Sequence, residues 1–319
     1  MTTCAVVTGV AGFIGSSLAE QLVADGVQVV GVDCFTGYYD EAMKHSNISA
    51  LLGSPRFSLV RADLRSVELE PILEGADVVF HQAGQPGVRS SWSDGFADYV
   101  SHNVLATQRL LEAAVAVGIP RVVNASSSSV YGNAVRHPVD ECDLPQPHSP
   151  YGVTKLAAEH LATLYGGNWG LSTVSLRYFT VYGPRQRPDM AMHRLFEAAN
   201  SGRPFPLFGD GSVVRDFTYV GDAVRANLAA AVADVAPGTV VNVAGGSQTS
   251  MRSLIELVGT ITGVEVPVDR RPAQLGDVQR TGGSIERARS LLGWEPVVSL
   301  RDGLDAQACW HRSRHRNAA

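Results

Sequence analysis

Two residues with complementary chemistry, Tyr151 and Lys155, lie four positions apart in a segment with helical periodicity, residues 151–164. Residues at positions i and i+4 share one face of a helix, so the phenol and the ammonium group point to the same side. A nearby positive charge favours the phenolate form of a tyrosine. Tyr151 could then remove a proton from a hydroxyl group while hydride leaves the same carbon, and Ser127 or a neighbouring serine could hold that hydroxyl. Alone, such a pair is typical of an exposed helix, so its meaning depends on the surrounding elements.

A glycine-rich turn near the amino terminus supplies that context. Residues 4–8 form a short apolar run typical of a buried strand, and Gly9, Gly12 and Gly15 follow at a spacing of three. Residues 13–24 have helical periodicity, and a second strand-like run ends at Asp33. This order of strand, turn, helix and strand is the context that a dinucleotide-binding fingerprint requires. A tight turn without a ligand is the alternative, and the flanking strand, helix and acid disfavour it.

Asp33 determines which dinucleotide we expect. A carboxylate at the end of the second strand can accept hydrogen bonds from both hydroxyls of a ribose, and it would repel a 2′-phosphate. The glycines let the backbone approach a pyrophosphate closely, and the amino terminus of the helix offers free N–H groups to it. The sequence therefore predicts NAD rather than NADP.

The order of the remaining segments predicts an α/β fold with a doubly wound parallel sheet. Strands are expected at 56–60, 77–81, 121–125 and 172–177, with helices at 67–73, 96–117 and 151–164 between them. The pattern changes at 184–222, which is rich in proline, glycine and arginine. We expect residues 1–178 to form mainly a Rossmann-type NAD-binding domain and residues 179–319 mainly a smaller C-terminal α/β substrate domain. The boundary is soft, because elements of the second half can return to the sheet.

Over nearly its whole length the chain resembles an extended short-chain dehydrogenase/reductase, and within that family a nucleotide-sugar 4-epimerase. The resemblance is carried by motifs spread along the chain: T-G-V-A-G-F-I-G (8–15), Asp33, A-D-L (62–64), H-Q-A (81–83), Asn103, S-S-S-S-V-Y-G (126–132), Tyr151 with Lys155, R-Y-F-T-V-Y-G-P (177–184), R-D-F-T-Y-V-G-D (215–222) and L-G-W-E-P (292–296).

The resemblance implies roles for individual residues. The catalytic serine of the family lies four residues before the tyrosine of V-Y-G, which implies a catalytic set of Ser127, Tyr151 and Lys155. It also implies that Asp63 and Leu64 border the adenine and that Tyr178 packs near the nicotinamide. The expected NAD-binding residues are Gly9, Gly12, Phe13, Ile14, Gly15, Asp33, Asp63, Leu64, Gln82, Ala83, Gly84, Gln85, Asn103, Ser126, Tyr151, Lys155 and Tyr178.

Two features favour epimerisation of a sugar acid. Relatives that dehydrate or decarboxylate their sugar usually carry an acidic residue where this chain has Ser128 and Ser129, so oxidation followed by re-reduction is the simplest outcome. Segments 33–40 and 185–191 are similar to the subgroup that converts UDP-glucuronate to UDP-galacturonate through a 4-keto intermediate. Thr180 replaces the asparagine common in glucose/galactose epimerases, and Gln274 stands where many relatives have an arginine.

The carboxylate of such a sugar needs donors, and the fork of an arginine suits it. The expected substrate-binding residues, with Arg215 at the diphosphate, are Arg89, Ser127, Ser128, Thr180, Arg185, Arg187, Arg215, Gln274 and Asp277. An alternative is that the arginines serve the diphosphate or only border the cleft, in a 4-epimerase for UDP-glucose/UDP-galactose or a UDP-pentose. A non-catalytic NAD sensor is a further alternative, and the retained Tyr151–Lys155 pair disfavours it.

Composition excludes several other classes of protein. The chain has 319 residues and a net charge of −5, so no broad basic surface is expected for nucleic acid. Its four cysteines are scattered without zinc-site spacing, so we expect free thiols and no metal. The first strand begins within a few residues and no apolar run is long enough to span a membrane, which predicts a cytoplasmic enzyme with no membrane partner. The family resemblance implies a homodimer built from the helices that follow Asn103 and Tyr151.

Overall fold

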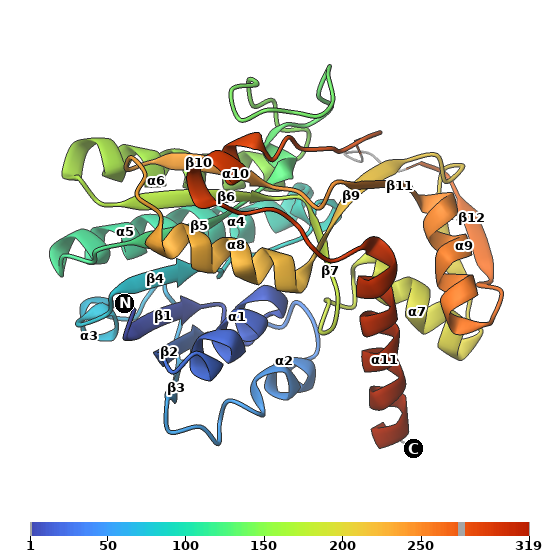
Figure 1. The fold of residues 1–319 in the computed structure, drawn as a ribbon, viewed down its shortest axis with the longest axis horizontal. Coiled ribbons are helices and arrows are strands. Elements are labelled where there is room, and N and C mark those ends of the chain that lie inside the picture. Colours follow the sequence, from blue (N-terminus) through green and yellow to red (C-terminus); the bar gives the residue numbers. More distant parts are fainter. Residues whose placement is uncertain (1, 274–277, 319) are drawn as a thin grey trace.

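A seven-stranded parallel sheet is the largest element of the computed structural model, which describes residues 2–273 and 278–318 (Figure 1). Its strands run in the order β10-β6-β5-β4-β1-β2-β3, and each neighbouring pair is parallel. The strands are β1 (Cys4–Thr8), β2 (Gln28–Asp33), β3 (Phe57–Arg61), β4 (Val78–His81), β5 (Val122–Ser127), β6 (Thr173–Tyr178) and β10 (Thr239–Val243). The predicted α/β, Rossmann-type fold is confirmed.

Helices cover both faces of this sheet because its strands are apolar on both sides. In β1, Ala5 and Val7 belong to one hydrophobic core and Val6 belongs to the other. The first core includes side chains from α1 (Phe13–Ala24), α2 (Glu41–Ile48), α8 (Val220–Val232) and α10 (Glu286–Leu292). The second includes side chains from α3 (Glu70–Leu73), α5 (Ala106–Ala116) and α6 (Pro150–Trp169).

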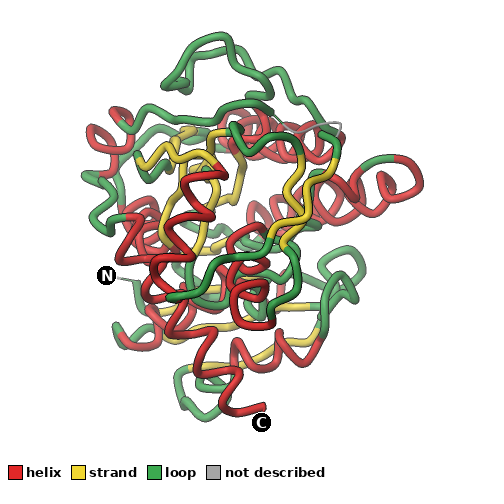
Figure 2. Tube along the Cα trace, turned by 90° about the vertical axis from the view of Figure 1, so that its right-hand side faces the viewer, coloured by secondary structure: helices red, strands yellow, loops and turns green. Residues whose placement is uncertain are grey.

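A smaller region lies to the right of the large sheet in Figure 1. It contains a three-stranded sheet, β11-β9-β7, and a two-stranded parallel sheet, β12-β8. The strands are β7 (Thr180–Tyr182), β8 (Phe205–Phe208), β9 (Val214–Tyr219), β11 (Ser247–Ser250) and β12 (Val268–Arg271). Helices α7 (Ala191–Ser201), α9 (Met251–Thr262) and α11 (Leu300–Ala318) share a third hydrophobic core with β7, β8 and β9. In Figure 2 this side faces the viewer, and α11 descends to the C terminus at the bottom.

The second half of the chain contributes to both regions. β10 pairs with β6 at one edge of the large sheet, and α8 and α10 pack on that sheet. The motifs around Asp222 and Trp294 join these elements: Trp294 Nε1 donates to the carbonyl oxygen of Asp222 at 3.0 Å, and the carboxylate of Asp222 accepts from the N–H groups of Val297 and Val298. These motif residues therefore anchor the segment that leads into α11.

The helix expected over residues 96–117 is present but not uniform. It consists of α4 (Phe96–Tyr99), a π-helical segment η3 (Val100–Leu105) and α5. The wider π turn contains Asn103, whose side chain is buried. Such segments are often found at functional sites. Within the described residues, no helix combines the length and apolar character needed to cross a membrane.

Candidate active site

The glycine turn lies between β1 and α1. Gly9 has a φ of +67°, and a Cβ atom there would lie 2.8 Å from backbone atoms of Ala83. A Cβ atom on Gly15 would collide with the carbonyl oxygen of Gly9. Gly12 is the N-cap of α1 and has no side chain to cap the first amide groups. The turn is therefore compact, and the N–H groups of the helix terminus remain available to an anion such as a pyrophosphate.

Asp33 is held in a fixed orientation beside this turn. It ends β2, and its Oδ2 accepts from the N–H of Ala11 at 3.0 Å while its Oδ1 accepts from the N–H of Phe35 at 2.7 Å. Each carboxylate oxygen has a second lone pair, so both can still accept a hydrogen bond from a ribose hydroxyl. The carboxylate lines the same cavity as the glycines.

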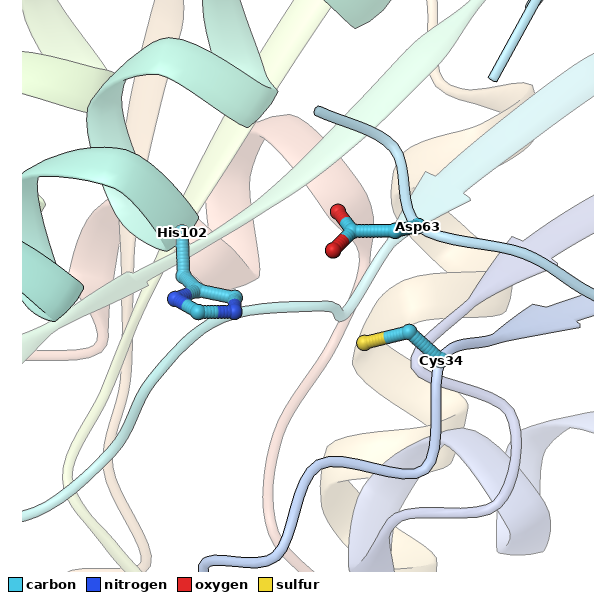
Figure 3. Close-up of side chains that lie close together, drawn as sticks. All are labelled: Cys34, Asp63 and His102. Carbon is cyan, nitrogen blue, oxygen red and sulfur yellow. The ribbon is translucent and has the colours of Figure 1, made fainter. Parts of the chain in front are cut away.

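Three polar side chains gather within that cavity. Figure 3 shows Cys34, Asp63 and His102 converging from three different segments, and all three line the cavity. Hydrogen bonds from Arg65 hold the pKa of Asp63 below its usual value, so Asp63 is a carboxylate. Burial, together with the charges of Asp33 and Asp63, raises the pKa of the Cys34 thiol. Cys34 is therefore a protonated thiol at neutral pH.

The start of α6 places Tyr151 and Lys155 at the cavity. Ser149 Oγ accepts from the N–H of Gly152 at 3.1 Å, and Pro150 occupies the first turn, so the helix begins directly before Tyr151. Tyr151 and Lys155 both line the cavity, one turn apart. Burial raises the pKa of Tyr151, while a hydrogen bond with Ser127 and the charge of Arg187 oppose the rise. Burial lowers the pKa of Lys155 to about 8.

Ser126, near the end of β5, is held by a buried ion pair that the sequence reasoning missed. Ser126 Oγ donates to Glu159 Oε2 at 2.6 Å, and Glu159 receives two hydrogen bonds from Arg177, at 2.9 and 2.6 Å. Arg177 also donates to the hydroxyl of Tyr131 at 2.7 Å. The spacing of Tyr151, Lys155 and Glu159 is i, i+4 and i+8, so one helix face carries all three, and that spacing could have identified Glu159.

Asn103 does not line the cavity but bonds a residue that does. Its Oδ1 accepts from the N–H of Gln85 at 2.7 Å, and its Nδ2 donates to the carbonyl oxygen of Gln85 and to Thr154 Oγ1, at 3.1 and 3.0 Å. Gln85 lines the cavity, whereas Asn103 is not among the lining residues. Asn103 therefore joins the loop after β4 to α6, which carries Tyr151.

Tyr178, at the end of β6, is joined to the same loop through Gln82. Its hydroxyl donates to Asn227 Oδ1 at 2.9 Å and accepts from Gln82 Nε2 at 3.1 Å. Burial raises its pKa above the usual range, so the hydroxyl is not ionised. Tyr178 can therefore form a rigid, uncharged wall for a flat ring.

Arg187 brings a positive charge to the rim of the cavity. Its Nε and Nη2 donate to the two carboxylate oxygens of Asp189 at 3.0 and 3.1 Å, and Asp189 also accepts from the hydroxyl of Tyr38 at 3.4 Å. Arg187 and Tyr38 line the cavity together with Tyr39. The two tyrosines were not predicted as site residues, although they lie within the 33–40 segment that carries the family resemblance.

Of the predicted NAD-binding residues, all except Asn103 line this one cavity. Lining residues that the sequence reasoning missed include Cys34, Thr36, Tyr38, Tyr39, Lys44, Pro86 and His102. Their side chains come mainly from the loops after β2 and β4. The periodic spacing of apolar residues predicts helices and strands but not the conformation of loops. Spacing alone therefore could not identify these lining residues.

The predicted substrate residues are distributed more widely. Arg187 lines the cavity, but Arg89, Ser127, Ser128, Thr180, Arg185 and Arg215 are not among the lining residues. Arg185 pairs with Glu20 of α1 at 2.6 Å, and the guanidinium of Arg89 lies 4.1 Å from the ring centroid of Phe208. Arg215 donates to the carbonyl oxygen of Val214 at 3.0 Å. Gln274 and Asp277 lie outside the described residues.

Known proteins share both the sequence and this arrangement. A UDP-glucuronic acid 4-epimerase from Bacillus cereus, solved with UDP-glucuronic acid and NAD, is 41% identical over 98% of this chain and 100% of its own, with a TM-score of 0.95. A UDP-glucuronate 4-epimerase of Thermodesulfobacterium geofontis is 34% identical over 96% of this chain and 95% of its own. A Bacillus subtilis protein named uncharacterized UDP-glucose epimerase YtcB is 41% identical over 98% of both chains.

The model of the NAD dependent epimerase/dehydratase family matches residues 5–244. That range includes the glycine turn, Asp33, the serines after β5 and the Tyr151–Lys155 pair. This chain belongs to the NAD-dependent epimerase/dehydratase family.

Proposed function

We propose that this protein converts UDP-glucuronate to UDP-galacturonate by NAD-dependent epimerisation at carbon 4. The observation that carries the proposal is a single cavity that is lined by three sets of residues: the glycine turn with Asp33, then Tyr151 with Lys155, and finally Arg187. The first set fits a dinucleotide, the second fits proton transfer at a hydroxyl, and the third fits a carboxylate. The solved relative from Bacillus cereus supports this combination of ligands.

Tyr151 is the residue that moves the proton. It takes the proton of the sugar 4-hydroxyl as the carbon is oxidised, and returns it to the ketone oxygen as the carbon is reduced. Bound NAD supplies the group that takes up a hydride from carbon 4 and gives it back. The burial that raises the pKa of Tyr151 is opposed by the Ser127 hydrogen bond and the charge of Arg187. Lys155, one turn away, adds a cation that favours the phenolate during proton transfer.

Inversion requires that the oxidised sugar turns over within the site. The 4-ketone must present its other face before it is reduced, so the residues that hold the sugar must release it without releasing the nucleotide. NAD is regenerated in each cycle, and no net oxidation results. The chain contributes no acid at positions 128 and 129, which agrees with a reaction that stops at epimerisation.

The carboxylate of the sugar creates a hazard that Arg187 can control. The 4-ketone of a uronate is a β-keto acid, which loses carbon dioxide when its carboxylate rotates perpendicular to the carbonyl plane. Charge-assisted hydrogen bonds from Arg187, and further hydroxyl donors such as Thr180 and Ser128, would hold the carboxylate away from that geometry. Asp189 already holds the guanidinium in place through its Nε and Nη2 atoms.

A neutral UDP-hexose is the second candidate substrate, because Asp189 neutralises Arg187 without any sugar carboxylate. The Bacillus subtilis relative, which is named as a UDP-glucose epimerase, also favours it. Assays on UDP-glucuronate, UDP-glucose and UDP-xylose, with products identified by NMR, distinguish the two. We expect UDP-glucuronate to have the largest kcat/KM. Preference for UDP-glucose or UDP-xylose would overturn the proposed substrate.

We also propose that two copies pair through the outer surface of α4, η3 and α6. Large apolar side chains are exposed there: Phe96 is 40% exposed, Leu105 47%, Val153 50% and Leu164 54%. Exposed apolar area of this kind marks interaction surfaces. Light scattering should give the mass of a dimer for the wild type and of a monomer for Leu105→Glu, with Val232→Glu on α8 as a control that stays dimeric. A monomeric wild type would refute the pairing.

We place this activity in the cytoplasm. The four free cysteines and the supply of nucleotide sugar and NAD there support the assignment. Fractionation of the source cells with an antibody against the chain tests it, and recovery in a secreted or membrane fraction would contradict it.

A further inference from the structure

A cluster of metal-ligating side chains lies outside the active-site cavity, between α7 and α11. His193 and Glu197 lie one turn apart on α7, and His311 comes from α11. His193 Nε2 is 3.9 Å from Glu197 Oε1, and His311 Nδ1 is 3.1 Å from the same oxygen. One ligand atom from each residue lies within 4.8 Å of the other two. Bonds of 2.0–2.1 Å in a tetrahedron separate ligand atoms by about 3.3 Å, so small side-chain rotations would suffice to bind one ion.

The surroundings of His193 prepare it for coordination. Its Nδ1 lies 2.7 Å from the carbonyl oxygen of Gln186, so this nitrogen carries the proton and Nε2 presents a lone pair towards Glu197. Gln186 is itself fixed, because its Oε1 accepts from the N–H of His193 and from Gln307 Nε2 of α11. Metal-binding histidines commonly have such a second partner on the other ring nitrogen.

The ligand set selects a class of metal. Two imidazole nitrogens and one carboxylate suit zinc and similar transition metals, whereas calcium and magnesium prefer oxygen ligands. Both imidazoles are buried, while the Glu197 side chain is 33% exposed and borders a groove with Arg194 and Arg203. The exposed side leaves room for a water molecule as fourth ligand.

We propose that His193, Glu197 and His311 form a zinc-class transition-metal site that cross-links α7 to α11. His311 is more than a hundred residues from His193 and Glu197, so the spacing of those two residues alone does not reveal the site. Metal bound to the folded chain stabilises it by mass action. The site therefore serves the packing of the C-terminal helix and not the chemistry at Tyr151.

Titration calorimetry of ZnCl2 into the full-length chain, without an affinity tag and stripped with a chelator, tests the proposal. We expect one zinc ion per chain and a rise in Tm of a few degrees on binding. Glu197→Gln keeps an oxygen for His311 but removes the anionic ligand, and should weaken binding about tenfold or more. Glu256→Gln, an exposed site on the neighbouring α9, is the matched control and should leave binding unchanged.

A second cluster, Cys34 with Asp63 and His102, must be separated from this one because its ligand atoms are also close together. The Cys34→Ser variant removes its thiol, and cobalt(II) then reports the ligands by its absorption. Cobalt bound in Cys34→Ser with a nitrogen and oxygen spectrum, and lost on adding Glu197→Gln, would support the site between α7 and α11. A thiolate charge-transfer band that disappears with Cys34→Ser, or the absence of any binding, would overturn it.

Discussion

Two arginine–carboxylate pairs flank the reactive residues, and they differ in their access to water. The first pair, Arg177 with Glu159, is called the floor pair here, and its side chains are only 4% and 3% exposed. Arg177 also donates to Tyr131, and Glu159 also accepts from Ser126. The second pair, Arg187 with Asp189, is called the rim pair, and its side chains are 20% and 36% exposed. The floor pair is enclosed by hydrogen-bond partners, whereas the rim pair borders an open cavity.

This difference in burial predicts different roles for the same chemistry. Removing one partner of a buried pair leaves an uncompensated charge and costs about 3–5 kcal/mol, whereas an exposed pair contributes about 0–1 kcal/mol. The floor pair therefore positions Ser126 and fixes α6 at Glu159 against β6. The rim pair can exchange partners cheaply, so a carboxylate of the substrate can share the guanidinium of Arg187 with Asp189.

The largest effect is expected from Tyr151→Phe, because this hydroxyl lies between the two pairs in the proposed mechanism and transfers the proton. The ring and its packing are retained, so the fold and NAD affinity should not change, while turnover should fall about 10²–10⁴-fold. Steady-state kinetics with a calorimetric measurement of NAD binding checks both. The Ser127→Ala variant should lose less turnover than Tyr151→Phe, because neighbouring serines can replace the hydrogen bond of Ser127. Activity of the phenylalanine variant above about a tenth of wild type would show that another residue transfers the proton.

Breaking the floor pair should cost stability as well as activity. Glu159→Gln leaves the buried guanidinium of Arg177 without its counter-charge, and we expect the free energy of unfolding to fall by about 3–5 kcal/mol in a denaturant titration. The double variant Glu159→Leu with Arg177→Met removes both charges and should recover much of that loss. If Glu159→Gln unfolds at the wild-type denaturant concentration, the floor pair does not hold the site together.

At the rim, Arg187→Ala should spare stability and change substrate use. A charge-assisted hydrogen bond contributes about 1.5–3 kcal/mol, so kcat/KM for UDP-glucuronate should fall about 10- to 100-fold. UDP-glucose, which lacks the carboxylate, should be affected much less. NMR should also detect some 4-keto-pentose, since the carboxylate is free to rotate. An equal loss on both sugars would assign Arg187 to the diphosphate or the scaffold, and Arg89 or Arg185 would then be tested.

The smallest effect is expected from Asp189→Asn, which keeps the shape of the rim but removes its negative charge. The substrate carboxylate no longer competes with Asp189, so the KM for UDP-glucuronate should fall by no more than about fivefold, as for the loss of an exposed pair. Stability should stay within about 0.5 kcal/mol of wild type. A higher KM would mean that Asp189 is needed to orient Arg187, and the exchange of partners would be excluded.

Residues whose role depends on local sequence were predictable. The glycine turn, Asp33 and the Tyr151–Lys155 pair lie within continuous strand–turn–helix patterns, and the parallel sheet follows from the alternation of those patterns. The strands predicted for the large sheet occur where expected, to within two residues at their ends. The helix at 96–117 was predicted as one element, because periodicity does not distinguish a π turn such as the one that carries Asn103.

Residues whose role depends on long-range contacts were not predictable from spacing. Glu159 and Arg177 are partners because β6 places Arg177 beneath α6, and Asp189 meets Tyr38 across 151 residues of chain. Helices α8 and α11 were not predicted, although both are long. α8 is alanine-rich and buried on the sheet, and α11 ends in alternating polar and charged residues, so neither has a simple apolar period.

The central claim is that carbon 4 of the sugar is oxidised and then reduced within one binding event. UDP-glucuronate carrying deuterium at carbon 4 tests it most directly, with conversion in ordinary water followed by NMR and mass spectrometry. The account predicts UDP-galacturonate that retains deuterium at carbon 4, with no accumulation of NADH. Loss of the label to water, or a label retained while solvent hydrogen enters at carbon 5, would contradict it.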